Sequence, residues 1–157
     1  MAVKPIPDGY TSVTPYLIVD DGAAALEFYK KAFGAVERFR LEWGNKLGHA
    51  EFTIGNAVVM MASEFPELGA LSPKTVGGTP VSLAVYTDDV DEMFARAVAE
   101  GATVVRPLEN QFYGDRSGTL EDPFGHRWSI STHVEDVDPE EMARRSEAAR
   151  SQAGDSD

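Results

Sequence analysis

Residues 113–133, YGDRSGTLEDPFGHRWSISTH, decide the fold of this chain because they have the pattern of two strands joined by a tight turn. Residues 122–125, DPFG, supply the turn chemistry: an Asp first, a Pro with fixed φ second and a Gly last. In the strand that follows, Trp128 and Ile130 fall on one face, and residues 127, 129, 131 and 133 are polar and fall on the other. This pattern is typical of a sheet that packs on helices and leaves a polar face lining a cleft, although an ordinary solvated hairpin is the alternative.

Outward from this hairpin, one order of elements occurs twice. A strand, a helix ended by a glycine (Gly34 or Gly101) and three further strands are predicted in each half of the chain. The predicted segments are residues 11–19, 23–33, 36–43, 48–54 and 57–62, then residues 81–86, 90–100, 103–106, 116–121 and 127–132. Such an internal duplication predicts an α+β fold of two βαβββ modules, module one at about residues 11–64 and module two at about residues 80–133.

The segments outside the modules have less regular patterns. Residues 4–8 form a Pro-containing arm that is expected to be irregular, and residues 64–80, rich in Gly, Pro, Ser and Thr, are expected to be a linker or flexible loop. Asp138-Pro139 begins a good helix N-terminus, so a short amphipathic helix is predicted to about residue 150, with residues 151–157 disordered. The chain thus divides into one domain, residues 1–137, and a C-terminal helix with an acidic tail, residues 138–157.

Composition restricts the classes of partner. The chain has 157 residues, 43% of them hydrophobic, which suits one globular domain. A formal net charge of −12 argues against nucleic acid or an anionic membrane surface as a partner. Cysteine is absent, which excludes disulfides, thiol catalysis and cysteine-bound metal. Because no segment has the length of a signal peptide or a membrane span, we expect a cytoplasmic protein.

Three stretches carry a resemblance to a known family. They are ALEFYKKAFGA at residues 25–35, HAEFTIGNAVVMMASE at residues 49–64, and YGDRSGTLEDPFGHRWSISTHVEDV at residues 113–137. Together they resemble the vicinal oxygen chelate superfamily, which contains glyoxalases, bleomycin-resistance proteins and extradiol dioxygenases, and within it most closely the PhnB-type branch. The resemblance covers about residues 10–137. It implies two βαβββ modules that form a curved mixed sheet around a shared cleft, in a homodimer.

The same resemblance has a consequence for metal binding. Metal-dependent members of the superfamily take one ligand from the first and one from the fourth strand of each module. Those places align with Thr14, Met60, Ser82 and Ser129. Catalytic divalent ions need imidazole nitrogen and carboxylate oxygen, so hydroxyls and a thioether predict that the metal site is absent and that no cofactor is bound.

His49 and Glu51 are the candidates for a replacement site. They are two residues apart on one predicted strand and so share a face. The pair offers two metal ligands, with His133 or Glu121 as a third, or an oriented general base, but a hydrogen-bonded structural pair is the simpler interpretation. His126, in the turn, is expected to be structural or exposed.

The other candidates are aromatic and hydrogen-bonding residues that suit a flat organic molecule. The complete predicted ligand-binding set is Tyr16, Trp43, His49, Glu51, Tyr86, Tyr113, Arg116 and Ser129. Arg116, next to Asp115, either forms an ion pair that stiffens the loop or anchors an anionic ligand. Two functions compete: a metal-free binding protein that sequesters a small molecule, and a vicinal-oxygen-chelate enzyme (lyase, isomerase or dioxygenase) with a relocated metal site or with His49 and Glu51. An interaction module with a vestigial cleft is a third possibility.

Overall fold

The computed structural model of the chain describes residues 2–154. Its elements are β1 (Tyr16–Val19), α1 (Gly22–Phe33), β2 (Val36–Trp43), β3 (Lys46–Ile54), β4 (Ala57–Ser63), the 3-10 helix η1 (Pro66–Leu68), α2 (Pro73–Val76), β5 (Ser82–Tyr86), α3 (Val90–Ala99), β6 (Thr103–Asn110), β7 (Asp115–Glu121), β8 (Arg127–His133) and α4 (Pro139–Gly154). The predicted α+β fold with two βαβββ modules is confirmed. No helix within the described residues is long and apolar enough to span a membrane.

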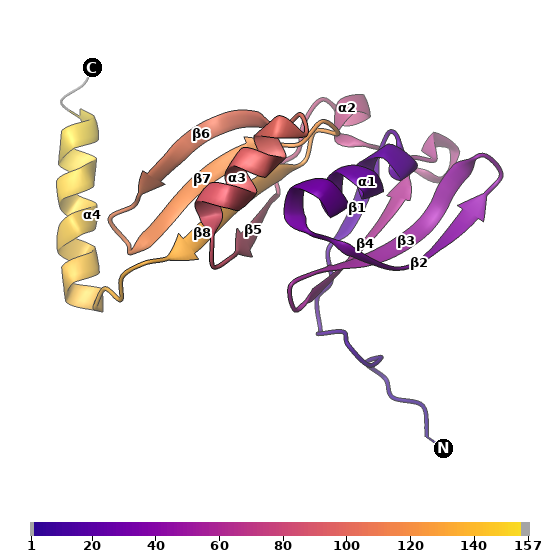
Figure 1. The fold of residues 1–157 in the computed structure, drawn as a ribbon, viewed down its shortest axis with the longest axis horizontal. Coiled ribbons are helices and arrows are strands. Elements are labelled where there is room, and N and C mark those ends of the chain that lie inside the picture. Colours follow the sequence, from indigo (N-terminus) through magenta and orange to yellow (C-terminus); the bar gives the residue numbers. More distant parts are fainter. Residues whose placement is uncertain (1, 155–157) are drawn as a thin grey trace.

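The two modules have the same topology. Their strand orders are β1-β4-β3-β2 and β5-β8-β7-β6, with the first strand of each module parallel to the fourth and the remaining pairs antiparallel. The predicted curved mixed sheet of the two modules thus consists of two four-stranded sheets, one in each module. These lie side by side, and α1 and α3 cover them from the same side and meet in the middle of the molecule (Figure 1).

Local sequence signals explain the helix ends. Asp21 caps α1 by accepting a hydrogen bond from the backbone N–H of Ala24 at 3.1 Å, and Gly34 ends the helix with a φ of 67°. Asp89 caps α3 in the same way through the N–H of Glu92. The predicted positions of both helices are thus close to those observed.

One buried carboxylate ties the two modules together. Asp122, the first residue of the DPFG turn, accepts hydrogen bonds from the Tyr29 hydroxyl at 2.7 Å and the Trp128 indole N–H at 2.8 Å. Its second oxygen accepts from the backbone N–H groups of Phe124 and His126 at 2.9 and 3.0 Å. Since Tyr29 lies on α1 and Trp128 on β8, the turn motif joins the helix of one module to the sheet of the other.

The hydrophobic core continues around this carboxylate. Trp128 and Ile130 are buried, as their predicted face requires, and the rings of Phe33 and Tyr29 lie 4.6 and 5.4 Å from that of Trp128. His126 donates its Nε2–H to the carbonyl oxygen of Ile18 at 2.8 Å, so of the two roles expected for this histidine the structural one is observed. The helix side of both sheets is therefore filled by packing, which leaves the opposite faces open.

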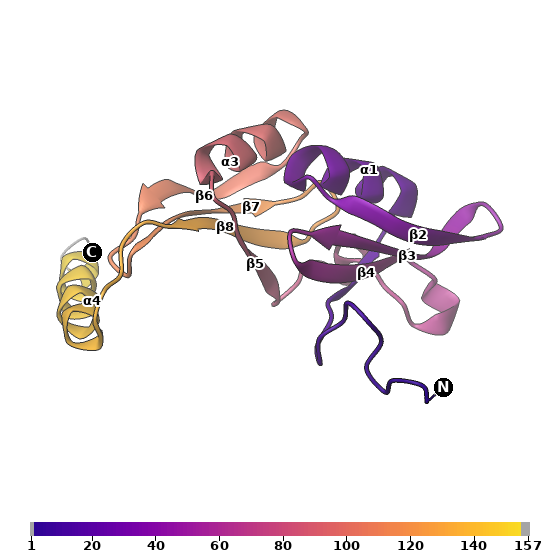
Figure 2. The same cartoon turned by 60° about the horizontal axis from the view of Figure 1, so that its bottom comes forward.

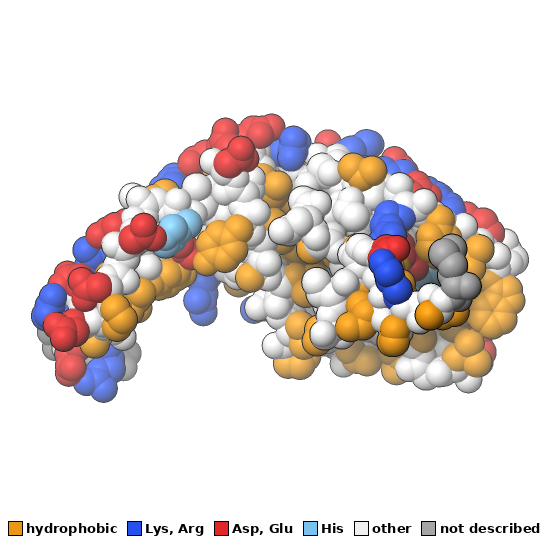
Figure 3. All heavy atoms as spheres, turned by 90° about the horizontal axis from the view of Figure 1, so that it is seen from below, with side chains coloured by type: hydrophobic (Ala, Val, Ile, Leu, Met, Phe, Trp, Pro, Cys, Tyr) orange, Lys and Arg blue, Asp and Glu red, His pale blue; other side chains and the backbone are white. Residues whose placement is uncertain are grey.

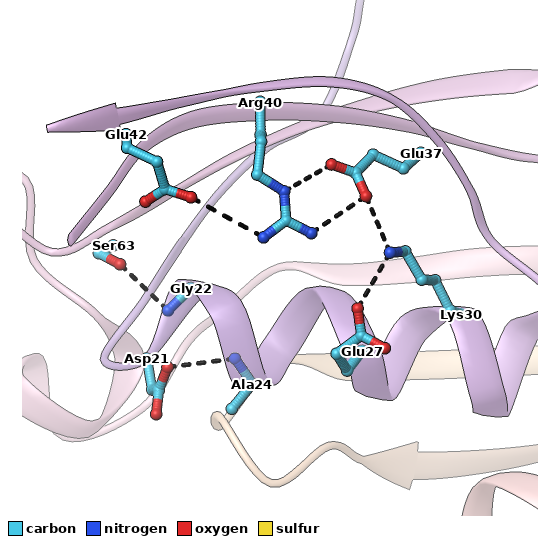
Figure 4. Close-up of polar contacts among 9 residues, drawn as sticks. All are labelled: Asp21, Gly22, Ala24, Glu27, Lys30, Glu37, Arg40, Glu42 and Ser63. Carbon is cyan, nitrogen blue, oxygen red and sulfur yellow. Dashed lines mark hydrogen bonds and ion pairs between the residues drawn. The ribbon is translucent and has the colours of Figure 1, made fainter. Parts of the chain in front are cut away.

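Charged side chains cover the outer surface of α1 and β2. Glu37 accepts hydrogen bonds from both Arg40 and Lys30, and Lys30 also contacts Glu27 (Figure 4). These hydrogen bonds, that from Arg40 first, hold the pKa of Glu37 at about 2. The network fixes the edge strand β2 to α1.

The first strand and the connecting segment differ from the sequence-based expectation. A strand was predicted over residues 11–19, but β1 begins at Tyr16 because Pro15 has no N–H for a strand ladder. Residues 64–80 are also not a flexible loop. They contain η1 and α2, and the hydroxyls of Ser72 and Thr75 donate to Glu64 at 2.6 and 2.8 Å.

The ends of the chain extend from the two modules in opposite directions. The N-terminal arm (residues 2–15) lies beneath the first module, on the side opposite α1, and α4 stands at the far end of the second module (Figure 2). Asp138 caps α4 through the N–H of Glu141 at 3.0 Å, as predicted. The helix runs to Gly154 instead of ending near residue 150, so residues 151–154 are helical, and the rest of the predicted disordered tail lies outside the described residues.

Candidate ligand-binding site

The open face of the first sheet carries several of the predicted site residues. Register places Tyr16 beside Met60, Met60 beside Glu51 and Glu51 beside Phe39, so these four side chains form one row across the sheet. His49 lies two residues before Glu51 on β3 and shares the same face. The structure therefore brings together Tyr16, His49 and Glu51 as the sequence predicted.

These three side chains form a hydrogen-bonded chain. The Tyr16 hydroxyl lies 2.8 Å from Nδ1 of His49, and Nε2 of His49 lies 2.9 Å from Oε2 of Glu51. Burial lowers the pKa of His49 and raises the pKa values of Glu51 and Tyr16. The arrangement assigns a neutral imidazole that accepts from the tyrosine and donates its Nε2–H to the carboxylate.

A cavity of about 640 Å³ lies between this face and the N-terminal arm, and we call it the first-module cavity. From the arm come Pro5, Ile6, Pro7, Tyr10, Thr11 and Ser12, and from the sheet Arg38, Phe39, Glu51 and Met60. The Arg38 guanidinium stacks over the Tyr10 ring at 5.0 Å. Viewed from below, hydrophobic side chains gather on this half of the face and along the arm, whereas charged side chains follow the helix-bearing edge and α4 (Figure 3).

The open face of the second sheet is lined by hydroxyls. Tyr86, Ser131, Ser117 and Glu109 form one row in register, and Ala84, Ser129, Thr119 and Arg106 form the next. The Ser131 hydroxyl donates to that of Ser117 at 2.8 Å, and those of Thr119 and Ser129 lie 3.2 Å apart. A cavity of about 560 Å³ lies over these rows and is walled by Phe112 and Tyr113; we call it the second-module cavity.

A buried carboxylate organises one end of the second-module cavity. Asp115 is 5% exposed, accepts the Tyr86 hydroxyl at 2.6 Å and lies 2.8 Å from Nδ1 of His133. The other nitrogen of His133 lies 2.8 Å from Asp136. Hydrogen bonding to Asp115, and then to Asp136, raises the pKa of His133, and hydrogen bonding to Asp115 raises that of Tyr86. The negative charge of Asp115 is therefore compensated by the side chains of His133 and Tyr86.

Four predicted site residues are not among the side chains that line these cavities: Tyr16, Trp43, His49 and Arg116. Tyr16 and His49 are connected to the first-module cavity through Glu51, whereas Arg116 and Trp43 lie elsewhere. Arg116 points to the helix side of the second sheet, where its guanidinium bonds to Asp91 on α3 at 2.8 and 3.0 Å. Of its two predicted roles, the stiffening ion pair is therefore the one observed, with Asp91 rather than Asp115 as the partner. Trp43 is 61% exposed and packs against Phe65 at 5.0 Å, beside the turn between β2 and β3.

The four positions aligned with metal ligands offer a poor donor set. Met60 and Ser129 lie on the open faces of β4 and β8, but their partners in register are Tyr16 and Ala84, two residues after Thr14 and Ser82. A phenol and a methyl group are no better ligands than two hydroxyls. The residues present do not fit a divalent ion of the kind that metal-dependent members hold.

The relocated metal site is not assembled within one chain. His133 bonds to Asp115 and Asp136 in the second module, and Glu121 lies 3.8 Å from Arg127, so neither joins His49 and Glu51. Residues 2–154 contain no group of three His, Asp or Glu side chains placed to hold a metal ion. The hydrogen-bonded interpretation of His49 and Glu51 is confirmed by their 2.9 Å contact.

Several cavity residues were missed by the sequence analysis. The arm residues gave no signal because an irregular segment has no periodicity that shows which face it covers. Asp115 and His133 are close only because β7 and β8 pair with these residues opposite each other. The alternation of β8 had placed His133 on the polar face, and the hairpin register could have added Asp115.

Similarity to known proteins agrees with this architecture. A sequence model of the Glyoxalase/Bleomycin resistance protein/Dioxygenase superfamily matches residues 10–130. The chain belongs to this superfamily. Among curated proteins it is similar to the uncharacterized protein Mb0911c of Mycobacterium bovis, with 43% identity over 148 residues that cover 92% of this chain and 95% of that protein.

Two solved structures share the fold. TioX from Micromonospora sp. ML1 is 25% identical, with a TM-score of 0.63 over 82% of this chain and 100% of TioX. The PhnB protein of Bacillus cereus, described as a putative 3-demethylubiquinone-9 3-methyltransferase, is 19% identical, with a TM-score of 0.60 over 78% of this chain and 99% of its own. At that identity, the second likeness concerns the fold alone.

Proposed function

We propose that this protein is a metal-free binding protein of the glyoxalase/bleomycin-resistance type, in the PhnB-type branch, that sequesters a flat or aromatic organic molecule. The observation that carries the proposal is the pair of cavities on the open sheet faces. Each has a volume in the range of small-molecule sites, and each combines aromatic walls with a few placed polar groups. The poor donor set at Thr14, Met60, Ser82 and Ser129 supports binding without metal.

The proposal includes a homodimer. In one chain the two cavities are separate, since residues 84–131 alone line the second-module cavity. The first strands β1 and β5 are sheet edges, and edges invite pairing or cover. Exposed apolar side chains flank them, among them Val13, Val81 and Tyr86. A second copy that placed its second module over the first module of its partner would unite the two faces in one cleft.

An enzyme is the second candidate, and the Tyr16–His49–Glu51 chain favours it. A carboxylate that orients an imidazole, which in turn accepts a tyrosine proton, is an arrangement suited to general acid–base catalysis. Such a site would act as a lyase or isomerase without metal. In the binding-protein interpretation the same chain only fixes the polar floor of the cleft.

Sedimentation velocity with a bound dye tests the proposal. We use three flat probes, 9-aminoacridine, acridine and acridine-9-carboxylate, and follow absorbance of the dye and of the protein together. At least one dye is expected to sediment with a species of twice the 17.0 kDa chain mass. If none of the three dyes sedimented with the protein, the binding-protein proposal would fail. A dye that sedimented with a monomer would contradict only the homodimer.

A further inference from the structure

Only one of the two carboxylate oxygens of Glu51 is hydrogen-bonded to another side chain of the described residues. Glu51 is 6% exposed and lines the first-module cavity. Its Oε2 is bonded to His49, and within residues 2–154 this is the only side-chain hydrogen bond that Glu51 makes. No side-chain oxygen or nitrogen of the described residues is both fully buried and unpaired, so Oε1 is reached from the cavity. A nearly buried carboxylate therefore offers one free oxygen to an occupant.

No positive charge of the protein compensates this carboxylate. Burial lowers the pKa of His49, which favours the neutral imidazole, and burial raises the pKa of Glu51 itself. Its neighbours in register, Met60 and Phe39, are apolar. Arg38 is the basic side chain in the cavity lining, but its guanidinium stacks on Tyr10 of the arm and forms no ion pair among the described residues. By contrast, Asp115 in the other cavity has His133 beside it.

Apolar side chains make up most of the remaining lining of the first-module cavity, to which Thr11 and Ser12 of the arm add two hydroxyls. Pro5, Ile6 and Pro7 of the arm face Phe39 and Met60 of the sheet across it. An apolar enclosure raises the cost of a buried carboxylate without a partner and strengthens a charge-assisted hydrogen bond to it. The combination of a free carboxylate oxygen and apolar walls selects one kind of ligand.

We infer that the first-module cavity takes a flat aromatic molecule that carries a protonated amine or another cationic N–H group, with that group donating to Oε1 of Glu51 and the ring enclosed by the N-terminal arm. The inference rests on the proposed function. It adds to that function the positive charge of the ligand and names Glu51 as the residue that recognises this charge. The N-terminal arm supplies apolar contacts to the ring, and Glu51 on the sheet supplies the selectivity for a cationic ligand.

Fluorescence titration of the full chain with the three acridines tests the inference. At slightly alkaline pH 9-aminoacridine is a cation, acridine is neutral and acridine-9-carboxylate is an anion, while the ring system stays the same. The cation is expected to bind at least about tenfold more tightly than neutral acridine, since charge-assisted hydrogen bonds are the strong ones. Glu51→Gln, which keeps the size of the side chain and an acceptor for His49, is expected to remove this preference and to leave the affinity for acridine unchanged.

Three further variants separate the possible causes. Met60→Lys places an ammonium beside Glu51 in register and is expected to abolish the cation preference without removing the carboxylate. Ile6→Ala is expected to weaken the binding of all three dyes by a similar factor, because it removes part of an apolar wall and alters no charge. Glu67→Gln is the matched control, because Glu67 is exposed and lines neither cavity, and it is expected to change nothing.

The possible results are distinguishable. A cation preference that survives Glu51→Gln, or that is lost in Glu67→Gln, overturns the inference while the proposed function stands. Equal binding of the cation and of neutral acridine by the unaltered chain also overturns it. If none of the three dyes binds, the proposed function fails as well.

Discussion

Replacing Asp122 with alanine is expected to lower the free energy of unfolding by about 4 kcal/mol or more, in a protein whose total stability is of the order of 10 kcal/mol. The carboxylate accepts four hydrogen bonds, two of them from Tyr29 and Trp128, which are almost completely buried. Without it those two donors are buried without a partner, and the DPFG turn loses the contacts that shape it. Urea denaturation followed by circular dichroism measures the loss.

Two variants serve as controls for Asp122. Tyr29→Phe removes one of the four hydrogen bonds and no other group, so a loss of about 1 kcal/mol is expected. Asp88→Ala removes an exposed aspartate that makes no side-chain contact among the described residues and should leave stability unchanged. If Asp122→Ala unfolded within 1 kcal/mol of the unaltered chain, the link between the modules would not be the one described here.

Substitution of Gly114 by alanine is the second change with a large expected effect, a loss of about 3 kcal/mol. Gly114 has a φ of +99°, and a Cβ placed there would lie 2.1 Å from the carbonyl oxygen of Glu135. Its own carbonyl accepts from the N–H groups of Val134 and Glu135 at 2.9 and 3.0 Å. The clash must therefore push away the segment that leads to α4, beside Tyr113 and the second-module cavity.

Gly55→Ala is the matched control for Gly114. Gly55 also has a positive φ, +56°, but a Cβ there would meet nothing within 4 Å. The substitution is expected to lower the free energy of unfolding by about 1 kcal/mol, which is the energy of placing an alanine at a positive φ. Thermal unfolding measures the loss of stability in both variants. Equal losses for Gly114→Ala and Gly55→Ala would show that the backbone at Glu135 moves away from the added Cβ without a loss of stability.

Much of the fold was predictable because its signals are local. Alternation along β8 placed Trp128 and Ile130 on the core face, and the two helix-ending glycines, Gly34 and Gly101, marked the duplication. The separation of the sheets was not predictable in this way. Whether β1 and β5 pair with each other or remain edges depends on how the modules pack through α1 and α3, and no local pattern records it.

The candidate site was predictable where residues share one strand. His49 and Glu51 were paired by their two-residue spacing, and Tyr16 was assigned to the same cleft by its aromatic character. Arg116 was placed wrongly in the set because its partner Asp91 is 25 residues away in sequence, and only the packing of α3 on β7 brings them together. The arm was missed for the same kind of reason, since its position follows from tertiary contacts alone.

The central claim, binding without metal, is tested most directly by thermal melting of the purified protein with and without a chelator, and again with zinc, nickel or manganese in modest excess. A site of micromolar affinity requires about 8 kcal/mol of binding, which hydroxyls and a thioether do not supply against water. Because a ligand that binds only the native state raises its stability, we predict the same melting temperature in every case. A tightly held stoichiometric metal whose removal lowers the melting temperature would contradict the account, and loss of that metal in His49→Ala would place it at the Tyr16–His49–Glu51 chain.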